Sequence, residues 1–447
     1  MKWFNLRHPE ETGTLLQAAR RSIGRDGGLF MPLNWPRWDD LEELLTLPSP
    51  ELWRECFTRL LGDEMESDAI AALISSSFSF PVPLVQVSEE VWSLELFHGP
   101  TLAFKDFGAR FLARVLGLSR PPGDTKPLSI LTATSGDTGA AVAQAFHQVP
   151  GIRVVVLYPQ GRVSPLQERL FATLGDNILA LRVAGSFDDC QALVKQCFQD
   201  RPLCERLGLT SANSINPARL VAQIAYYLSG VAEWRRRTGR RDAPAISVPC
   251  GNFGNLTAGI LAGRLGLPVS RFIVATNAND VVPEFLGGRS YQPRPSRVTL
   301  ANAMDVGDPN NWTRIRALFN NDDEALRRSL ISGSLDNDGI RLALRDLRSL
   351  GYQADPHGAV AWRVLEHHRK PGEHGLFLET AHPAKFAEVI QEAQGEAIPL
   401  PAALKKTLSL PMLAEDLPFS LAHLQNRLER FCQGGSAAGN ISPTGTT

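Results

Sequence analysis

Short apolar runs alternate with amphipathic stretches from about residue 128 to residue 378. The apolar runs predict buried strands at residues 128–131, 153–157, 177–183, 245–248, 272–275 and 376–378. The intervening stretches predict helices at residues 138–147, 165–174, 187–199, 217–234, 256–265 and 358–368. Such alternation is typical of a parallel sheet covered by helices on both faces. The predicted fold class is therefore α/β, with open parallel sheets.

The two ends of the chain have different patterns. Residues 1–85 contain acidic amphipathic stretches, at residues 39–46 and 50–61, and no glycine-rich phosphate loop, so we expect a mainly helical N-terminal region. Residues 434–447 are rich in Gly, Ser, Thr, Asn and Pro, a composition that predicts a disordered tail. A chain of 447 residues exceeds the size of one hydrophobic core. We therefore expect two α/β lobes between these ends, at residues 86–215 and 216–433.

Composition and charge exclude several classes of protein. The apolar fraction of 43%, the charged fraction of 21% and the net charge of −1 favour neither nucleic acid nor an anionic membrane as a partner. The six cysteines and nine histidines lack the spacing of zinc, redox or His-Glu-x-x-His motifs, so no metal is expected. No secretory signal or membrane-spanning stretch is evident. These features predict a cytoplasmic protein.

Lys105 is the first candidate for chemistry. It follows an apolar, strand-like stretch and begins an amphipathic helix whose buried face carries Phe107, Phe111 and Val115. Apolar neighbours and the positive end of a helix both disfavour the ammonium form. A lysine that loses its proton easily can attack a carbonyl to form a Schiff base. Considered alone, a lysine at this position is far more often an exposed residue that solvates a helix start, because most lysines are exposed.

Two loops at predicted strand ends are suited to anions, and strand ends are where ligands bind in open parallel sheets. Residues 132–139, Thr-Ala-Thr-Ser-Gly-Asp-Thr-Gly, present hydroxyls and amides at a helix start. Residues 249–259 contain Gly-Asn-Phe-Gly-Asn, whose glycines let the backbone approach a phosphate. The second loop matches neither the dinucleotide nor the nucleoside triphosphate motif, which favours one small phosphate group. The alternatives are a helix cap and a tight turn.

Two further segments carry candidate ligand contacts. In residues 379–386, Pro383 suits the first position of a helix, which leaves Thr380 at a strand end where its hydroxyl could meet a ring nitrogen. In residues 213–219, Arg219 lies in the first turn of a predicted helix. A buried arginine is costly unless an anion pairs with it, so this segment predicts a second anion site. Alone, each segment could be an ordinary helix start.

Five words of sequence, taken in order, resemble the threonine synthase family. They are Phe-His-Gly-Pro-Thr-Leu-Ala-Phe-Lys-Asp-Phe, Thr-Ser-Gly-Asp-Thr-Gly, Asn-Ser-Ile-Asn-Pro-Ala-Arg, Gly-Asn-Phe-Gly-Asn and Thr-Ala-His-Pro-Ala-Lys-Phe. The resemblance extends from about residue 28 to residue 430. It implies the tryptophan synthase β-like fold of pyridoxal 5'-phosphate enzymes. It also implies conversion of O-phospho-L-homoserine and water to L-threonine and phosphate.

The resemblance also implies a role for each candidate residue. Lys105 would hold the cofactor, Thr380 would bond its ring nitrogen, and substrate contacts would come from the hydroxyl-rich loops. The implied cofactor phosphate contacts are Gly251, Asn252, Phe253, Gly254 and Asn255; the implied substrate carboxylate contacts are Thr134 and Ser135; the implied substrate phosphate contacts are Thr138, Ser214, Asn216 and Arg219.

Two residues depart from the pattern that the resemblance implies. Asp137 is expected at the cofactor, where the wider fold family commonly has an asparagine that donates a hydrogen bond, yet a carboxylate cannot donate unless it is protonated. Glu379 precedes Thr380, where a small residue is usual. The acid could alter the electronics of the ring or point away from it.

Three other readings remain open from the sequence. Another enzyme of the same fold, such as a dehydratase or a β-replacement synthase, would have no use for a second phosphate site. A metabolite-binding protein without activity would not need Lys105. A Rossmann nucleotide-binding protein would also leave Lys105 without a role. For a synthase acting on this small substrate, we expect a monomer or a homodimer, with no nucleic-acid or membrane partner.

Overall fold

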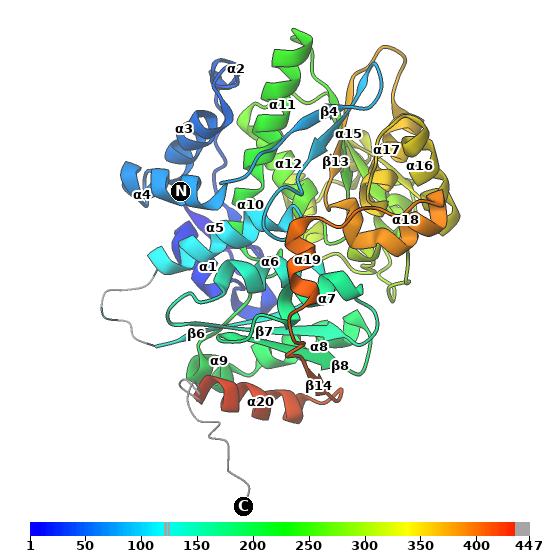
Figure 1. Cartoon of the computed structure of the whole chain (residues 1–447). Helices are drawn as coiled ribbons and strands as arrows, with labels where there is room; N and C mark the ends of the chain where they lie inside the picture. The colour runs from blue at the N-terminus through cyan, green and yellow to red at the C-terminus, as the bar shows by residue number, and fades with distance from the viewer. Residues whose placement is uncertain (120–122, 124–125, 434–447) are drawn as a thin grey trace, which may run out of the picture.

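A computed structural model describes residues 1–119, 123 and 126–433 of the chain. It contains two α/β lobes, each built on its own sheet, with an N-terminal region packed beside them (Figure 1). The predicted α/β class is confirmed. The predicted tail, residues 434–447, lies outside the described residues. No helix in the described part of the chain is both long enough and apolar enough to cross a bilayer.

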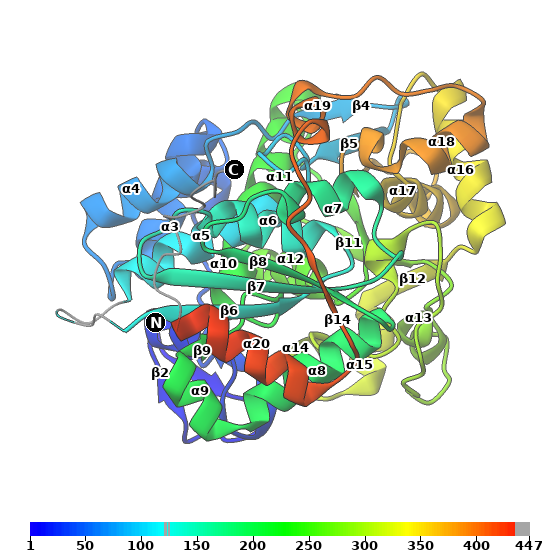
Figure 2. The ribbon, with the colours of Figure 1, turned by 60° about the horizontal axis from the view of Figure 1, so that its bottom comes forward.

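The sheet of the first lobe has five parallel strands in the order β14-β8-β7-β6-β9. Helices α6 and α7 cover one face, and α8, α9 and α20 lie on the other (Figure 2). The bounds are β6 (Leu128–Ala133), β7 (Ile152–Pro159), β8 (Ile178–Val183), β9 (Leu209–Thr210), β14 (Glu415–Leu417), α5 (Lys105–Leu118), α6 (Asp137–Phe146), α7 (Pro165–Ala172), α8 (Phe187–Gln199), α9 (Arg201–Leu207), α10 (Pro217–Ala222) and α20 (Leu421–Gln433).

The sheet of the second lobe has six strands in the order β12-β11-β10-β13-β5-β4, and only the β4–β5 pair is antiparallel among them. Helix α17 packs on one face with α16 and α18, and α11 and α12 lie on the other (Figure 1). The bounds are β4 (Leu84–Gln86), β5 (Val91–Glu95), β10 (Ala245–Pro249), β11 (Arg271–Thr276), β12 (Leu330–Ser334), β13 (Gly375–Glu379), α11 (Ile224–Thr238), α12 (Gly254–Leu265), α13 (Val281–Leu286), η2 (Asn302–Met304), α14 (Trp312–Leu318), α15 (Asp323–Ser329), α16 (Asn337–Ser349), α17 (Pro356–His368), η3 (Pro383–Phe386), α18 (Ala387–Gln394) and α19 (Ala402–Leu408).

The lobes exchange segments of chain. Strands β4 and β5 precede the first lobe in sequence but lie in the second sheet, whereas β14 and α20 come from the end of the chain and pack in the first lobe. The parallel pairing of β5 with β13 brings their carboxyl ends together, with Glu95 opposite Glu379. The segments that lead to Lys105 and Thr380 therefore start from adjacent strand ends. We keep the domain boundaries at residues 85, 215 and 433 as a proposal. In it, the exchanged strands and helix are assigned to the lobe in which they pack.

The N-terminal region contains a small sheet as well as the expected helices. Its antiparallel strands are arranged β2-β1-β3, and the indole of Trp53 ties the region to α11 by donating to Ala225 O at 2.9 Å. The bounds are β1 (Trp3–Asn5), β2 (Thr12–Gly13), β3 (Phe30–Pro32), α1 (Leu15–Arg21), η1 (Arg25–Gly27), α2 (Leu41–Leu44), α3 (Ser49–Leu61) and α4 (Ser67–Ser77).

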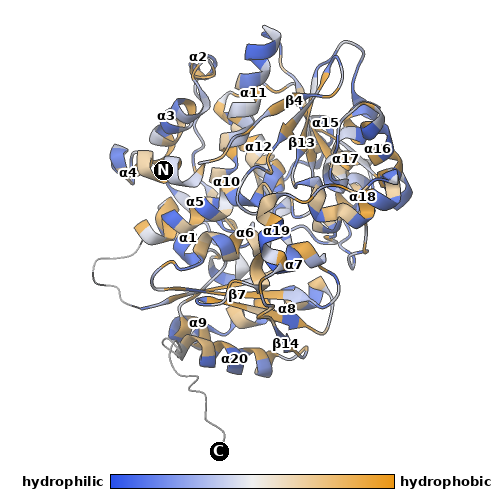
Figure 3. Cartoon of the chain, in the orientation of Figure 1, coloured by the Kyte–Doolittle hydropathy of each residue, from blue (hydrophilic) through white to orange (hydrophobic). Residues whose placement is uncertain are grey.

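Alternating side chains of the first sheet enter two different apolar cores. Ile130 and Val154 face the large core shared with α6, whereas Leu131 and Val155 face a smaller core with α8 and α20. This two-residue period is the one that a strand imposes. Both faces of the central strands are consequently apolar (Figure 3), which explains why they appear in the sequence as continuous hydrophobic runs.

All six predicted strands and all six predicted helical regions occur, with small shifts at their ends, but one region expected as a single helix is two helices. The stretch at residues 217–234 is divided at Gln223 into α10 and α11. The Gln223 amide bonds Leu220 O, three residues back, and its side-chain amide bonds Arg219 O at 2.8 Å. In a continuous helix, Arg219 O would accept a hydrogen bond from the backbone amide four residues later. Because the Gln223 side chain bonds this carbonyl instead, the helix is interrupted beside the predicted anion site.

Candidate functional site

Lys105 lies in a small cavity of about 40 Å³ at the carboxyl ends of β5, β10 and β13. It is the first residue of α5, as the sequence predicted. Four predicted segments meet here, together with residues that the sequence did not indicate. The lining residues are Phe104, Lys105, Ser214, Arg219, Gln223, Pro249, Gly251, Asn252, Phe253, Gly254, Asn255, Ala303, Met304, His357 and Thr380.

The environment of Lys105 favours the neutral amine. Burial and then the positive charge of Arg219 lower the pKa of Lys105 to about 7, against the opposing effect of Asp137. The Nζ atom lies 4.3 Å from the centre of the Phe104 ring. The sequence prediction of a lowered pKa was therefore right in direction. The second cause is the arginine charge, which the sequence argument had not considered.

Residues 251–255 form an anion-binding turn before α12. Among the described residues, the five backbone amides of this turn have no hydrogen-bond acceptor. Phe253 adopts a left-handed conformation, with φ of 59°, which turns the chain into the helix. A Cβ at Gly251 would lie 2.6 Å from Ala303 O, so only glycine fits there. Converging unpaired amides at a helix start suit a phosphate group.

Asn255 adds a side-chain donor to this turn. Its Oδ1 accepts hydrogen bonds from the hydroxyls of Tyr226 at 2.6 Å and Tyr227 at 2.7 Å, which fixes the orientation of the amide. The Nδ2 atom is buried, and the described residues provide no partner for it. An unpaired buried donor is costly. This atom is therefore suited to a ligand oxygen.

Arg219 has the features of a second anion site. Its side chain is 1% exposed, and Nη1 donates to Ala212 O at 2.8 Å, whereas Nε has no acceptor in the described part of the chain. Burial lowers the pKa of Arg219 to about 10. Arg314 is equally buried, but it bonds Phe30 O, Ile215 O and Asn311 Oδ1. The donors of Arg314 are thus satisfied within the protein, whereas Arg219 keeps a buried donor that a ligand anion could satisfy.

Ser214 connects the two anion sites. The Asn252 side chain donates to the Ser214 hydroxyl at 2.7 Å, and Asn311 Nδ2 donates to Asn252 O at 2.9 Å. The hydroxyl of Ser214 keeps its proton available for a further acceptor. A ligand phosphate at Arg219 would therefore be coupled to the turn at residues 251–255 through one hydrogen bond.

Thr380 presents a free hydroxyl to the cavity. Its backbone is fixed because the amide of Phe104 donates to Thr380 O at 2.9 Å, and its hydroxyl has no partner within the described residues. A hydroxyl can donate or accept, so it can bond a neutral ring nitrogen.

Glu379 points away from the cavity. Its carboxyl is fully buried against α17, where Oε1 accepts from the amide of Asp355, and a Cβ at position 358 would lie 1.5 Å from Oε2. Burial and then the charge of Asp355 raise the pKa of Glu379 well above its ordinary value, which favours the protonated acid. Of the two roles left open for this acid, the geometry favours the one remote from the ring.

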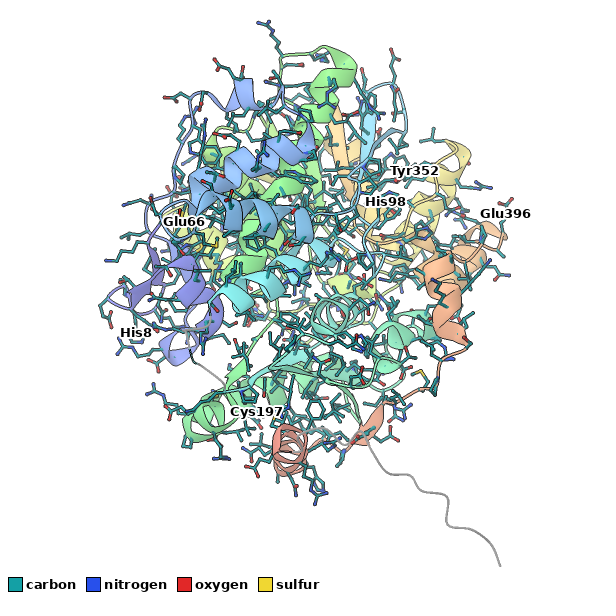
Figure 4. The ribbon with its side chains drawn as sticks, turned by 60° about the vertical axis from the view of Figure 1, so that its left-hand side comes forward. His8, Glu66, His98, Cys197, Tyr352 and Glu396 are labelled. Carbon is teal, nitrogen blue, oxygen red and sulfur yellow. The ribbon has the colours of Figure 1, made fainter. Side chains whose placement is uncertain are left out.

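A polar cluster continues beyond the end of β5. Glu95 accepts a hydrogen bond from the Tyr352 hydroxyl at 3.0 Å and lies 2.8 Å from His98 Nε2; both partners are labelled in Figure 4. The Tyr352 hydroxyl also lies 2.8 Å from Ser93 Oγ. These contacts stabilise the strand end that precedes Lys105, but none of the residues lines the cavity.

Five predicted residues do not line the cavity: Thr134, Ser135, Asp137, Thr138 and Asn216. The hydroxyl of Thr134 accepts hydrogen bonds from two amides of its own loop, Gly136 at 2.9 Å and Gly139 at 2.7 Å. Asn216 donates to the carbonyls of Ala19 and Ser211 and caps α10. These bonds give both side chains a structural role. Thr138 is half-buried with no side-chain partner among the described residues, and Ser135 lines an adjacent cleft.

Asp137 is engaged elsewhere. It pairs with Lys385 Nζ and accepts a hydrogen bond from Gln167 Nε2 at 2.8 Å. Burial is the largest single effect and would raise the pKa of Asp137, but the charge of Lys385 and the hydrogen bonds from Lys385 and Gln167 together keep the pKa below its ordinary value. Asp137 is therefore an ionised acceptor and cannot donate to a ligand.

Sequence reasoning missed His357, Gln223 and the role of Lys385. His357 Nδ1 lies 2.8 Å from Asp355, and the Ala303 amide donates to His357 Nε2 at 3.2 Å, which indicates a neutral ring protonated at Nδ1. The word Asp-Pro-His-Gly signals a helix start and nothing more. Lys385 lies within the word Thr-Ala-His-Pro-Ala-Lys-Phe, but no spacing identified Asp137 as its partner.

A cleft of about 710 Å³ adjoins the cavity between the lobes. Its lining includes Ser135 and Ser164 from the first lobe and Asn302 and Lys385 from the second. The short helix η2 separates the two spaces, since Asn302 faces the cleft while Ala303 and Met304 face the cavity. In the described part of the chain, no group of three or more His, Cys, Asp or Glu side chains could hold a metal ion.

Comparisons with known proteins agree with this architecture. The family model described as pyridoxal-phosphate dependent enzyme matches residues 80–375, and the model described as threonine synthase, C-terminal matches residues 358–430. A threonine synthase from Haemophilus influenzae is 48% identical over 425 residues, covering 95% of this chain and 99% of that protein.

Solved structures give the same result. The crystal structure of threonine synthase from Escherichia coli has a TM-score of 0.91 and 46% identity, covering 96% of this chain and all of that one. The structure of PLP-bound threonine synthase from Brucella melitensis has a TM-score of 0.88 and 31% identity, covering 97% of this chain and all of that one. The chain belongs to the threonine synthase family of pyridoxal-phosphate-dependent lyases.

Proposed function

We propose that this enzyme converts O-phospho-L-homoserine and water to L-threonine and phosphate, with pyridoxal 5'-phosphate held on Lys105. The observation that carries the proposal is the pair of separate unpaired donor sets beside Lys105. One set is the amides of residues 251–255 with Asn255 Nδ2, and the other is Arg219 with the Ser214 hydroxyl. A phosphorylated cofactor and a phosphorylated substrate together require two such sets.

The fit of the cofactor is supported by the donors present. The turn at residues 251–255 would hold its phosphate, Thr380 would bond its ring nitrogen and Lys105 would bind its aldehyde carbon. The bound cofactor supplies an electron sink for a carbanion on the substrate. A neutral hydroxyl at the ring nitrogen does not enforce a positive charge there, which favours elimination and addition over transamination.

Lys105 would then move protons at the substrate. When it is free of the cofactor, its Nζ would act as a base, with a pKa lowered to about 7, close to the pH at which a general base works best. It would take the Cα proton and return it in the last step. Overall, Cβ would exchange one hydrogen for the hydroxyl group of water, Cγ would become a methyl group, and phosphate would leave with the remaining proton.

Arg219 and Ser214 would hold the substrate phosphate. The guanidinium would stabilise the charge that grows on the leaving group, in a buried site where such an interaction is strong. Thr138 and Ser135 offer free hydroxyls for the substrate phosphate and carboxylate. Thr134 and Asn216, whose bonds are internal, would support the same loops indirectly.

The substrate would enter through the cleft of about 710 Å³, because the cavity at Lys105 is much smaller. Ser135 and Lys385 line the cleft, and η2 lies between the cleft and the cavity. We also propose a cytoplasmic location, which the free cysteines of the described residues support, and a monomer or homodimer as the working unit.

The direct test is to incubate the purified enzyme with O-phospho-L-homoserine and to identify the amino acid by chromatography while phosphate is measured. We expect L-threonine and phosphate in equal amounts, and no product from a Lys105→Ala variant. Formation of a keto acid from L-serine or L-threonine, with phosphohomoserine left unchanged, would instead identify a dehydratase.

A further inference from the structure

Lys385 makes a buried ion pair that the proposed reaction does not use. It lies in η3, its side chain is fully buried, and its ammonium pairs with the carboxylate of Asp137. The same Nζ donates to Thr101 O at 3.0 Å. Thr101 precedes Lys105 by four residues, and Thr380 precedes Lys385 by five. One ammonium therefore joins the loops that carry Ser135, Lys105 and Thr380.

An ion pair is an expensive way to join loops. Removing two charges from water costs several kcal/mol for each ion, and apolar pairs of similar volume are often as stable. The Asp137 carboxylate also has Gln167 as a neutral partner. The presence of a charged pair beside Lys105 suggests a role for its charges as well as for its contacts.

We propose that Lys385 is a positioning residue whose ion pair with Asp137 fixes the loops around Lys105 and sets the balance of charge at the nitrogen of Lys105. The inference rests on the proposed function, because it concerns the nitrogen to which the cofactor is bound.

The charged groups that change the pKa of Lys105 belong to three elements. Arg219 on α10 and Lys385 on η3 lower the pKa of Lys105, after burial, and Asp137 on α6 raises it. Of the remaining neighbours, His357 is neutral by its hydrogen bonds, and Asp106 accepts from the amide and hydroxyl of Thr101. The carboxyl of Asp106 opposes the effect of burial on the pKa of Arg219.

The two members of the pair thus act on Lys105 in opposite directions. Removing the cation of Lys385 leaves the Asp137 carboxylate unbalanced, which favours the protonated nitrogen. Removing the carboxylate leaves the cation unbalanced, which favours the deprotonated nitrogen. If the pair served only to hold the loops together, either change would break the same contact and loosen the site in the same way.

The test uses Lys385→Met and Asp137→Asn in the holoenzyme. The absorption of the bound cofactor depends on whether the nitrogen contributed by Lys105 carries a proton, so a pH titration of the absorbance reports its pKa without turnover. We expect Lys385→Met to raise this pKa and Asp137→Asn to lower it, each by on the order of one unit. Lys385→Arg, which keeps the charge, should remain close to wild type.

Two controls complete the experiment. Lys370 is an exposed lysine, and Lys370→Met should leave the titration unchanged. If either single variant fails to fold, the double variant Asp137→Asn with Lys385→Met should have a pKa between those expected for the two single variants, because two opposing charges are removed together. A double variant with a pKa raised as far as in Lys385→Met would contradict the charge balance.

Failure of the inference is distinguishable from failure of the proposed function. If the wild-type cofactor is not attached at Lys105, as shown by peptide mapping, the proposed function fails. If it is attached there and both single variants shift the pKa in the same direction, or neither shifts it, only the role of the Lys385–Asp137 pair is refuted.

Discussion

Replacement of Arg219 by methionine should separate activity from stability. The side chain is 1% exposed, Nε has no acceptor in the described structure, and its one protein hydrogen bond is to Ala212 O. Methionine has a similar length and removes a charge whose burial lowers the pKa of the arginine to about 10. The loss of one backbone hydrogen bond, about 1 kcal/mol, is offset by relief of the buried charge.

The effect on catalysis should be much larger. Removing one donor that stabilises developing charge costs about 2.7–4 kcal/mol, which lowers kcat/KM about 100- to 1,000-fold. Initial rates of phosphate release give kcat/KM, and thermal melting gives stability. We expect the Arg219→Met enzyme to lose activity by this factor while its Tm is unchanged or higher.

Arg314→Met is the matched comparison. Arg314 is equally buried, but its donors satisfy Phe30 O, Ile215 O and Asn311 Oδ1. Its removal leaves three acceptors without a partner, at about 1–3 kcal/mol each, so Tm should fall sharply. The reasoning is refuted if Arg219→Met lowers Tm as much as Arg314→Met does. It is also refuted if Arg219→Met keeps kcat/KM within about fivefold of wild type, roughly 1 kcal/mol.

Three further changes test other parts of the site. Gly251→Ala should weaken cofactor binding in equilibrium dialysis, because the added Cβ would lie 2.6 Å from Ala303 O. Gly263→Ala is the control and should leave binding unchanged, because its added Cβ would have no atom nearer than 3.6 Å. Equal binding by both variants would contradict the account of the turn. Glu379→Gln should alter stability at neutral pH by less than about 1 kcal/mol, because the raised pKa favours the protonated acid, which the amide resembles in shape and charge. Since the folded pKa is raised, wild-type stability falls as pH rises above 4.5, and unfolding at several pH values should show a shallower fall in the variant; identical slopes would count against a neutral acid. Thr380→Val should lower kcat by roughly three- to tenfold, the equivalent of one hydrogen bond, with cofactor absorbance retained, and a full-rate enzyme would exclude a role for this hydroxyl.

The central elements were predictable because burial on both faces makes their sequences continuously apolar. Strand β10, whose five residues are all buried, is an example. Edge strand β12 was missed, since Ser332, Gly333 and Ser334 give it no apolar signal. The pairing of β5 with β13 could not be predicted either, because it joins segments that are distant in sequence and depends on the whole fold.

The site residues also fall into two groups, those whose position follows from local sequence pattern and those whose role depends on distant parts of the chain. Lys105, Thr380 and the turn at residues 251–255 follow strands, and the position of strand ends is a property of local pattern. The bonds that occupy Asn216 and Asp137 depend on partners from other elements, Ala19 and Lys385. A list of hydroxyls, amides and carboxylates in the sequence cannot show which of them are already satisfied inside the protein.

The most direct test is the site of cofactor attachment. The purified holoenzyme is reduced with borohydride, digested and mapped by mass spectrometry. We predict the pyridoxyl adduct on the peptide that contains Lys105 and none on the peptide that contains Lys385, a buried lysine that lines the adjoining cleft. An unmodified Lys105 peptide, or an adduct on Lys385 instead, would contradict the account.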